Sequence, residues 1–297
     1  CRRNLVCCRP LTKSCSFVAG SRVGIGKVVF LEVNIGVPRG PVNFMSDQWQ
    51  DNFVHAVKTT KRLGMELILG TGPGWAGSGG PWVKPEDSMQ HLVGATTKVS
   101  GPIKYKGKLA VPKPPKPNYF AGMSDHWEKV REEWYEDVSV LAFPTPNDIK
   151  VIDKIDLKSL KETQPYSIWK HVPRYVKSEA TYKKLNKESV INPNEIIDIT
   201  DNMTKDGTLE WEVPDGNWTI MRFVSRTTGQ TTRPAPTPGH GYETDKFNPK
   251  SFEKHWENFQ QKLLDRIGSK ESGSSWTRIH LDSWEMSSQN WSRQFQE

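Results

Sequence analysis

The chain has 297 residues, enough for one large domain or two ordinary ones, and 35% of them are hydrophobic. Its formal net charge of +7 arises in the first 27 residues, which hold six basic and no acidic side chains. The remainder is close to neutral, so the charge gives no indication of nucleic-acid binding. No stretch of 18 or more apolar residues occurs, and a membrane-spanning helix is therefore not expected.

The N-terminal segment 1–20 differs in composition from the rest of the chain. All four cysteines lie in it, at positions 1, 7, 8 and 15, without the spacing of a metal finger. It also lacks the apolar core of a signal peptide. We therefore expect residues 1–20 to be non-native or disordered, and a small redox or metal-binding head is the alternative.

The next region predicts a strand–helix–strand unit. Residues 28–33 are β-branched, aromatic and continuous, which is typical of a buried strand. Ser46 is a suitable N-cap for a helix that ends at Leu63, before Gly64. Residues 65–69 form a second strand, so the order indicates parallel strands joined by a right-handed crossover.

A glycine-rich loop, residues 70–82, follows the second strand at the end where α/β proteins place their sites. It lacks the Gly-Lys-Ser/Thr of a Walker A loop, and Pro73 and Pro81 interrupt any dinucleotide-binding pattern. We expect its glycines to let the backbone fold tightly around a ligand, with Trp75 and Trp82 as walls.

The segment 92–235 has a different character, with little helical periodicity and several short β-like runs. It is expected to be a β-rich insertion with strands at 109–111, 138–143, 196–199, 209–213 and 218–224, the last two joined by a hairpin turn at 215–217. A helix over 251–267 and a strand over 276–281 return to the first pattern. So few α/β strands cannot close an eight-stranded barrel, so the sheet is open and small or the chain is a fragment.

Two carboxylates, Asp282 and Glu285, follow the end of the last strand beside Trp284. A carboxyl group against an indole has a raised pKa and can act as a general acid. The aromatic ring also offers a flat surface to a sugar. The alternative interpretation is an edge strand that runs into a polar loop.

Four segments, in order, resemble glycoside hydrolase family 106, the α-L-rhamnosidases. They are FLEVNIG (30–36), GPGWAGSGGPWV (72–83), GYETDKFNP (241–249) and HLDSWEMSSQNW (280–291). The resemblance extends from about residue 23 to residue 297. It implies an α/β fold, a partial (β/α)8 (TIM-type) barrel over 21–91 and 236–297, interrupted by the β-rich insertion 92–235. The chain is then a fragment of the catalytic region.

The resemblance also implies hydrolysis of terminal α-L-rhamnosyl linkages in plant polysaccharides or glycosides, with inversion and with calcium. Inversion requires an acid and a base about 6.5–9.5 Å apart, on either side of the anomeric carbon. Calcium binds oxygen ligands and could hold vicinal sugar hydroxyls. A rhamnose-containing oligo- or polysaccharide is the implied partner, and the implied location is the bacterial periplasm or the exterior of the cell.

Carried onto this sequence, the resemblance makes Glu285 the catalytic acid. The residues expected to bind substrate are Trp75, Trp82, Asp282, Trp284, Asn290, Glu32 and Asn34. Glu243 and Asp245 are expected to bind calcium or sugar hydroxyls, and helix N-capping is the alternative role for them. The second catalytic carboxylate is expected beyond residue 297, so that the isolated chain would be inactive.

Two other classes of protein remain open. A carbohydrate-binding module without catalysis would use the tryptophans as a platform and the carboxylates only as hydrogen-bonding groups. A nucleotide-binding α/β protein would use the glycine-rich loop, although this loop lacks the lysine that binds phosphate. Removal of Glu285 would separate an enzyme from a binding module, because a module would keep its ligand affinity and have no turnover to lose.

Overall fold

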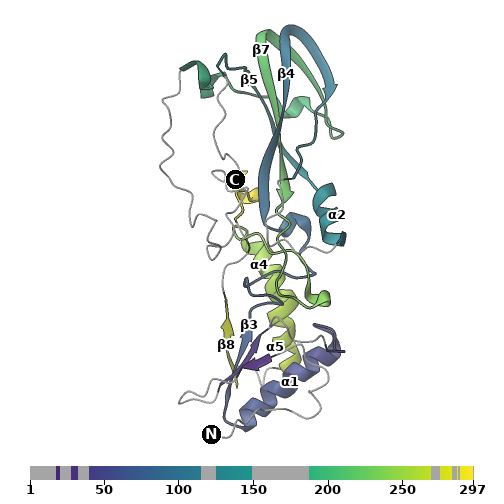
Figure 1. Cartoon of the computed structure of the whole chain (residues 1–297), viewed down its shortest axis with the longest axis vertical. Helices are drawn as coiled ribbons and strands as arrows, with labels where there is room; N and C mark the ends of the chain where they lie inside the picture. Colours follow the sequence, from purple (N-terminus) through teal and green to yellow (C-terminus); the bar gives the residue numbers. More distant parts are fainter. Residues whose placement is uncertain are drawn as a thin grey trace, which may run out of the picture.

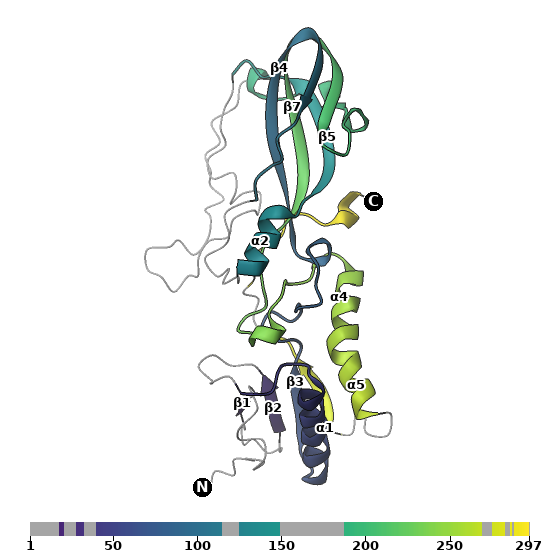
Figure 2. The same ribbon diagram turned by 90° about the vertical axis from the view of Figure 1, so that its right-hand side faces the viewer.

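The computed structural model describes residues 18–20, 28–32, 40–114, 125–148, 187–268, 275–282, 286 and 288–296. In these ranges the chain forms two four-stranded sheets. Figure 1 shows the sheets at opposite ends of an elongated molecule, and Figure 2 shows the same separation after a quarter turn. The C-terminal residues lie between the two ends, beside the base of the upper sheet.

The first sheet has the strand order β1-β2-β3-β8. Its strands are β1 (Val18–Gly20), β2 (Val28–Glu32), β3 (Glu66–Gly70) and β8 (Trp276–His280). β2, β3 and β8 are parallel to one another, whereas β1 is antiparallel to β2. Helix α1 (Asp47–Arg62) connects β2 to β3, which confirms the predicted unit of two parallel strands and a crossover helix.

Local sequence signals set the ends of α1. The Ser46 hydroxyl accepts a hydrogen bond from the Trp49 amide at 3.3 Å and so satisfies one of the free N–H groups of the first turn. Lys61 and Arg62 lie in the last turn, where positive charge favours the helix dipole. Gly64 has φ 63°, the left-handed conformation that ends helices without a Cβ clash.

A second helical run covers the same sheet. It consists of α4 (Pro249–Trp256), a π-helical turn (Glu257–Gln261) and α5 (Lys262–Ile267), and α5 packs against α1. The core between these helices and the sheet contains Leu31, Val42, Trp49, Phe53, Val57, Leu67, Leu69, Phe259, Leu263, Ile267 and Trp276. Gly268 then ends the run, and the chain returns to the sheet as β8.

The second sheet has the order β4-β7-β5-β6 and is entirely antiparallel. Its strands are β4 (Gln90–Lys108), β5 (Glu136–Pro144), β6 (Ile197–Asp198) and β7 (Thr208–Thr227). β4 and β7 pair from Gln90 with Thr227 to Lys108 with Thr208 and form a long twisted ribbon. A separate core under this sheet consists of Leu109, Val140, Ala142, Ile199, Leu209, Trp211, Val213 and Ile220.

The long ribbon differs from the short strands that the sequence predicts. β7 passes through residues 215–217, so the predicted hairpin turn is wrong. β4 lies alongside and pairs Gly101 with Gly216, and the turn-forming residues produce only a local shift of register in the ladder. The strand predicted at 109–111 is also wrong, because these residues are irregular and Leu109 serves as a core side chain.

Helix α2 (Asp125–Glu133) is fastened to the second sheet by Arg226, a buried residue of β7. Its guanidinium donates to the Glu132 and Trp134 carbonyls at 3.0 and 3.1 Å. It also donates twice to the Pro112 carbonyl, at 3.1 and 2.8 Å. One planar cation therefore donates to two carbonyls at the end of the helix and to one carbonyl of a neighbouring segment.

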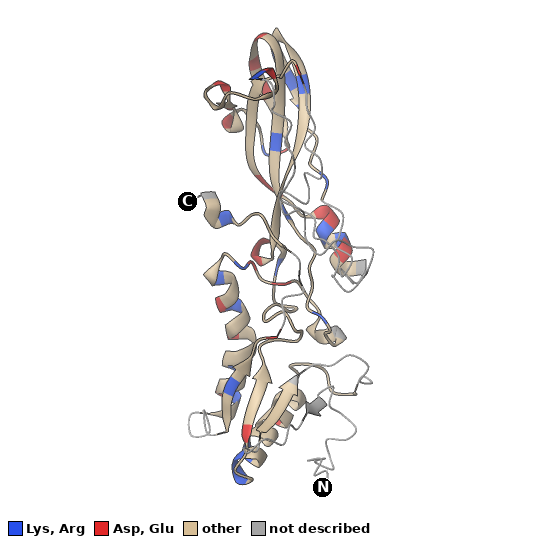
Figure 3. Cartoon of the chain, turned by 60° about the vertical axis from the view of Figure 1, so that its left-hand side comes forward, with Lys and Arg blue, Asp and Glu red and all other residues tan. Residues whose placement is uncertain are grey.

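The described surface carries both signs of charge. Figure 3 shows Lys and Arg interspersed with Asp and Glu along the helices and both sheets, consistent with the near-neutral composition beyond residue 27. Short 3-10 turns lie at Pro85–Asp87, Lys187–Ser189, Pro193–Glu195, Thr200–Asn202, Thr237–Gly239 and Arg293–Gln296. None of the helices in the described ranges combines the length and the apolar character that crossing a bilayer requires.

Candidate functional site

The glycine-rich loop after β3 packs directly against the backbone of residues 230–243. The Trp75 amide donates to the Arg233 carbonyl at 2.7 Å, and the Gly80 amide donates to the Tyr242 carbonyl at 3.1 Å. Gly79 has φ 99°, and a Cβ there would lie 2.7 Å from the Tyr242 carbonyl oxygen. Gly74 and Gly79 thus make room for the protein's own backbone, and a ligand enclosed by this loop stays a prediction.

The His255 ring lies between the two ends of this loop and donates to one of them. The buried ring places Nε2 2.7 Å from the Thr71 carbonyl oxygen and Nδ1 3.1 Å from the Gly79 carbonyl oxygen. Burial, reinforced by the nearby Lys246 charge, lowers the pKa of His255 to about 4, so the ring is neutral at pH 7. A neutral ring has a single N–H, and Gln260 supplies a further donor to the Thr71 carbonyl at 2.7 Å.

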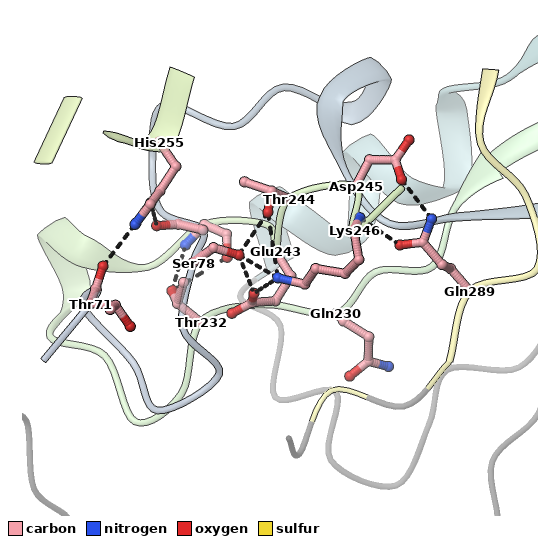
Figure 4. Close-up of polar contacts among 12 residues, drawn as sticks. Thr71, Ser78, Gln230, Thr232, Glu243, Thr244, Asp245, Lys246, His255 and Gln289 are labelled. Atoms are coloured by element: carbon pink, nitrogen blue, oxygen red, sulfur yellow. Dashed lines mark hydrogen bonds and ion pairs between the residues drawn. The ribbon is translucent and has the colours of Figure 1, made fainter. Parts of the chain in front are cut away.

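A buried ion pair lies beside the loop (Figure 4). Glu243 has no exposed surface, and its Oε2 accepts from Lys246 Nζ at 2.8 Å and from Ser78 Oγ at 3.2 Å. Lys246 Nζ also donates to Ser78 Oγ, which lies 2.7 Å from Thr244 Oγ1. The other carboxylate oxygen of Glu243, Oε1, is buried and has no hydrogen-bond partner among the described residues.

The Asp245 carboxylate is also buried, but it accepts hydrogen bonds from three groups. Its Oδ1 accepts from the Phe247 amide at 2.9 Å and from Gln289 Nε2 at 2.7 Å. Its Oδ2 accepts from Ser292 Oγ at 2.6 Å. The Gln289 side chain completes the arrangement, because its Oε1 accepts from the Lys246 amide at 3.0 Å.

These surroundings do not fit a calcium ion at Glu243 and Asp245. Calcium takes six to eight oxygen ligands. Here an ammonium, hydroxyls, an amide side chain and a backbone N–H donate to the two carboxylates, and donors of this kind compete with a cation. Within the described ranges no group of three or more His, Cys, Asp or Glu side chains is placed to hold a metal.

Asn290 anchors the chain that follows β8 to the start of β4. Its Oδ1 accepts from the Leu92 amide at 2.8 Å, and its own amide donates to the Gln90 carbonyl at 3.2 Å. His91 adds a contact of 3.0 Å between its Nε2 and the Ser288 carbonyl. The segment 288–292 is therefore held by β4 on one side and by Asp245 on the other.

The remaining site predictions divide into described and undescribed residues. Trp82 packs against Phe44, His255 and Phe259, with ring centroids 6.4, 5.7 and 6.3 Å away, and so contributes to the core under the loop. Trp75 is half-buried and Asp282 is exposed. Glu285, Trp284, Asn34 and the side chain of Glu32 lie outside the described residues.

Sequence reasoning missed four members of this cluster: Ser78, Lys246, His255 and Gln289. The opposite charges of Glu243 and Lys246, close together in the sequence, were the one signal available for their ion pair. Ser78 and His255 contact residues more than 160 positions away in the sequence. Gln289 contacts a carboxylate 44 positions earlier. No local sequence pattern indicates contacts of this kind.

The geometry defines a mixed α/β protein. Its buried polar cluster lies where the loops after two neighbouring parallel strands, β3 and β8, meet one segment, 242–246. Residues 16–297 match glycoside hydrolase family 106, described as alpha-L-rhamnosidase, and the chain belongs to this family. The match includes β1 and therefore begins inside the segment 1–20 that the sequence sets apart.

Two known proteins illustrate the relationship. The chain is 34% identical over 273 residues to a protein of Formosa agariphila named "Putative beta-glucuronidase", and the alignment covers 92% of this chain and 21% of that protein. The structure of a rhamnosidase from Novosphingobium sp. PP1Y resembles it with a TM-score of 0.64 at 21% identity, over 90% of this chain and 36% of that one. The second likeness shows the fold, and the chain spans a minor part of both proteins.

Proposed function

We propose that the protein to which this chain belongs hydrolyses terminal α-L-rhamnosyl linkages in plant polysaccharides or glycosides, with inversion at the anomeric carbon. The observation that carries the proposal is the family match over residues 16–297, which includes the glycine-rich loop and the segment with Glu285. The parallel order β2-β3-β8 with its crossover helix α1 supports a further proposal, that this sheet is one part of a (β/α)8 barrel in the whole protein.

In this mechanism Glu285 is the general acid and protonates the departing glycosidic oxygen. A second carboxylate, contributed by another part of the whole protein, activates water on the opposite face of the sugar. The described residues serve the reaction by holding the backbone of two segments in place. The glycine-rich loop is fixed by His255 and the Glu243–Lys246 pair, and the segment after Glu285 is fixed by Asp245 and Asn290.

Calcium remains a proposal for the whole protein. When bound, it would supply positive charge and coordination for sugar hydroxyls. Its ligands would be residues other than Glu243 and Asp245, since both carboxylates already accept from protein donors. Export to the bacterial periplasm or the cell exterior is likewise proposed from the family.

A second candidate is hydrolysis of β-glucuronides. It rests on the 34% identical relative, whose name is "Putative beta-glucuronidase". A glucuronide carries a carboxylate that rhamnose lacks, so the two substrates require different charge in the binding pocket. Assays on both substrates therefore distinguish the two candidate functions.

The test is release of the aryl group from an aryl α-L-rhamnoside and from an aryl β-D-glucuronide by the full-length protein. Each assay includes a calcium chelator arm, a Glu285→Gln variant and, as the matched control, a Glu212→Gln variant at an exposed acid of β7. Rhamnoside turnover that Glu285→Gln removes and Glu212→Gln retains supports the proposal. Turnover of the glucuronide alone supports the second candidate, and sugar binding without turnover by the folded protein supports a binding module.

A further inference from the structure

Asp245 connects two segments that are distant in sequence, 245–247 and 288–292. The residue is 2% exposed. It accepts from Gln289 and Ser292, which belong to the segment 288–292, as well as from the neighbouring Phe247 amide. Three donors with normal hydrogen-bond distances occupy the two oxygens, an arrangement that fixes the carboxylate strongly.

We infer that Asp245 is a positioning residue that holds the segment after Glu285 in place, an inference that rests on the proposed function. Glu285 lies three residues before Ser288, so at most about 10 Å of extended chain separates it from the anchored segment. A short stretch of chain therefore links the anchored segment to the acid. Misplacement of a reacting group by about 1 Å can reduce a rate about 100-fold.

Gln289 is the central member of the clamp. Its Oε1 accepts from the Lys246 amide at 3.0 Å, and its Nε2 donates to Asp245 Oδ1 at 2.7 Å and to the Trp291 carbonyl at 3.0 Å. The side chain is buried, and its amide oxygen and nitrogen are both bonded in this one orientation. Removing the Asp245 carboxylate leaves a buried Gln289 donor and the Ser292 hydroxyl without their acceptor.

Asp245 is itself held on a rigid support. Its amide donates to the Asp87 carbonyl at 2.8 Å. The Asp87 carboxylate in turn accepts from Lys254 Nζ of α4, at 2.7 Å to each oxygen. The clamp is thus continuous from helix α4, through the turn before β4, to the segment that follows Glu285.

The experiment uses the full-length protein and measures kcat per folded molecule together with hydrogen exchange of residues 288–292. Asp245→Ala is expected to lower kcat at least 10-fold with KM changed less than threefold, and to raise exchange in the segment. Asp245→Asn is expected to recover most of the lost kcat, because its oxygen accepts from Phe247 and Gln289 and its NH₂ donates to Ser292 Oγ.

Two further variants make the test specific. Gln289→Leu is expected to reproduce the loss of kcat, and the double variant Asp245→Ala/Gln289→Leu to be no worse than either single change, since both break one clamp. Asp206→Ala is the control: this acid accepts from Thr204 and Thr208 at the start of β7, whereas the segment 288–292 contacts Gln90, which pairs with the other end of β7. It is expected to leave kcat and the exchange of 288–292 unchanged.

The outcomes separate the inference from the proposed function. Unchanged exchange of 288–292 in Asp245→Ala overturns the inference, whether or not the protein is a glycosidase. Unchanged kcat in an active enzyme overturns it as well. An Asp245→Asn variant as inactive as Asp245→Ala, with a raised calcium requirement, would instead make Asp245 a metal ligand. Absence of turnover by the wild-type protein rejects the proposed function, and the exchange measurement then decides the clamp alone.

Discussion

Replacing Lys246 with methionine tests whether the buried Glu243 carboxylate depends on its cationic partner. The two charged groups are 2.8 Å apart, with side chains 20% and 0% exposed. At an effective dielectric constant of about 20, the gross attraction at this distance is about 6 kcal/mol. Methionine removes the attraction but leaves the desolvated carboxylate in place. We expect a loss of about 3 kcal/mol in the free energy of unfolding. This value is at the lower end of the range for a broken buried ion pair, because Lys246 is partly exposed.

Urea unfolding at pH 7 measures this loss, and two variants control it. The double change Glu243→Gln/Lys246→Met removes both charges and is expected to recover about 2 kcal/mol of the loss. Lys250→Met changes an exposed lysine on α4 and is expected to stay within about 0.5 kcal/mol of wild type. A loss below about 1 kcal/mol for Lys246→Met, or a double variant no more stable than the single one, would refute the reasoning.

Three further predictions concern stability. The pKa of His255 is about 4 in the folded protein against the ordinary 6.5, so the neutral ring stabilises the fold fully above pH 6.5. This stabilisation of about 3 kcal/mol is lost as the pH falls towards 4. Urea midpoints measured between pH 7 and 4 should therefore fall less steeply in His255→Gln than in the wild-type protein. Arg226→Met leaves buried carbonyls without donors and should cost about 3 kcal/mol in urea unfolding, of which Arg226→Lys recovers only part. Gly79→Ala and Gly216→Ala place alanine at nearly the same φ, 99° and 102°, but only the first meets other atoms within 4 Å. Gly79→Ala should therefore be the less stable variant by about 2 kcal/mol in thermal unfolding, and equal losses would count against the close packing of the loop.

The first sheet could be predicted from the sequence because its signals are local. Ser46 and Gly64 mark the ends of α1, and the apolar runs of β2 and β3 read as buried strands. The parallel order followed from the length of the connection between them. These features depend on neighbouring residues, which a sequence pattern reports directly.

The second sheet was harder to predict from the sequence. β4 has no apolar run over most of its length and is largely exposed, so its strand character comes from pairing with β7. The same pairing carries β7 through residues 215–217, where the local signal favours a turn. A partner strand more than 100 residues away thus overrides a short-range preference, which no local pattern can show.

The site predictions named residues in the segments 242–246 and 288–292, but the sequence could not decide the roles of those residues. The acidic residues Glu243 and Asp245 stood out in the sequence, but a hydrogen-bond acceptor and a metal ligand have the same sequence signature. Only the partners distinguish them: an ammonium for Glu243, and an amide, a hydroxyl and a backbone N–H for Asp245. Substrate contacts of Trp75, Asp282 and Trp284 stay predictions.

The segment 242–246 links the two loops that leave neighbouring strand ends. Through Glu243 and Lys246 it contacts Ser78 in the loop after β3, and through Asp245 it contacts Gln289 in the segment after β8. These contacts use different side chains, so the two loops should respond separately. Lys246→Met should raise hydrogen exchange in 74–80 and Asp245→Ala in 288–292, each with little effect on the other. Equal responses of both loops to either change would mean that 242–246 acts as one rigid unit, and the anchoring of the proposed acid could then not be assigned to Asp245 alone.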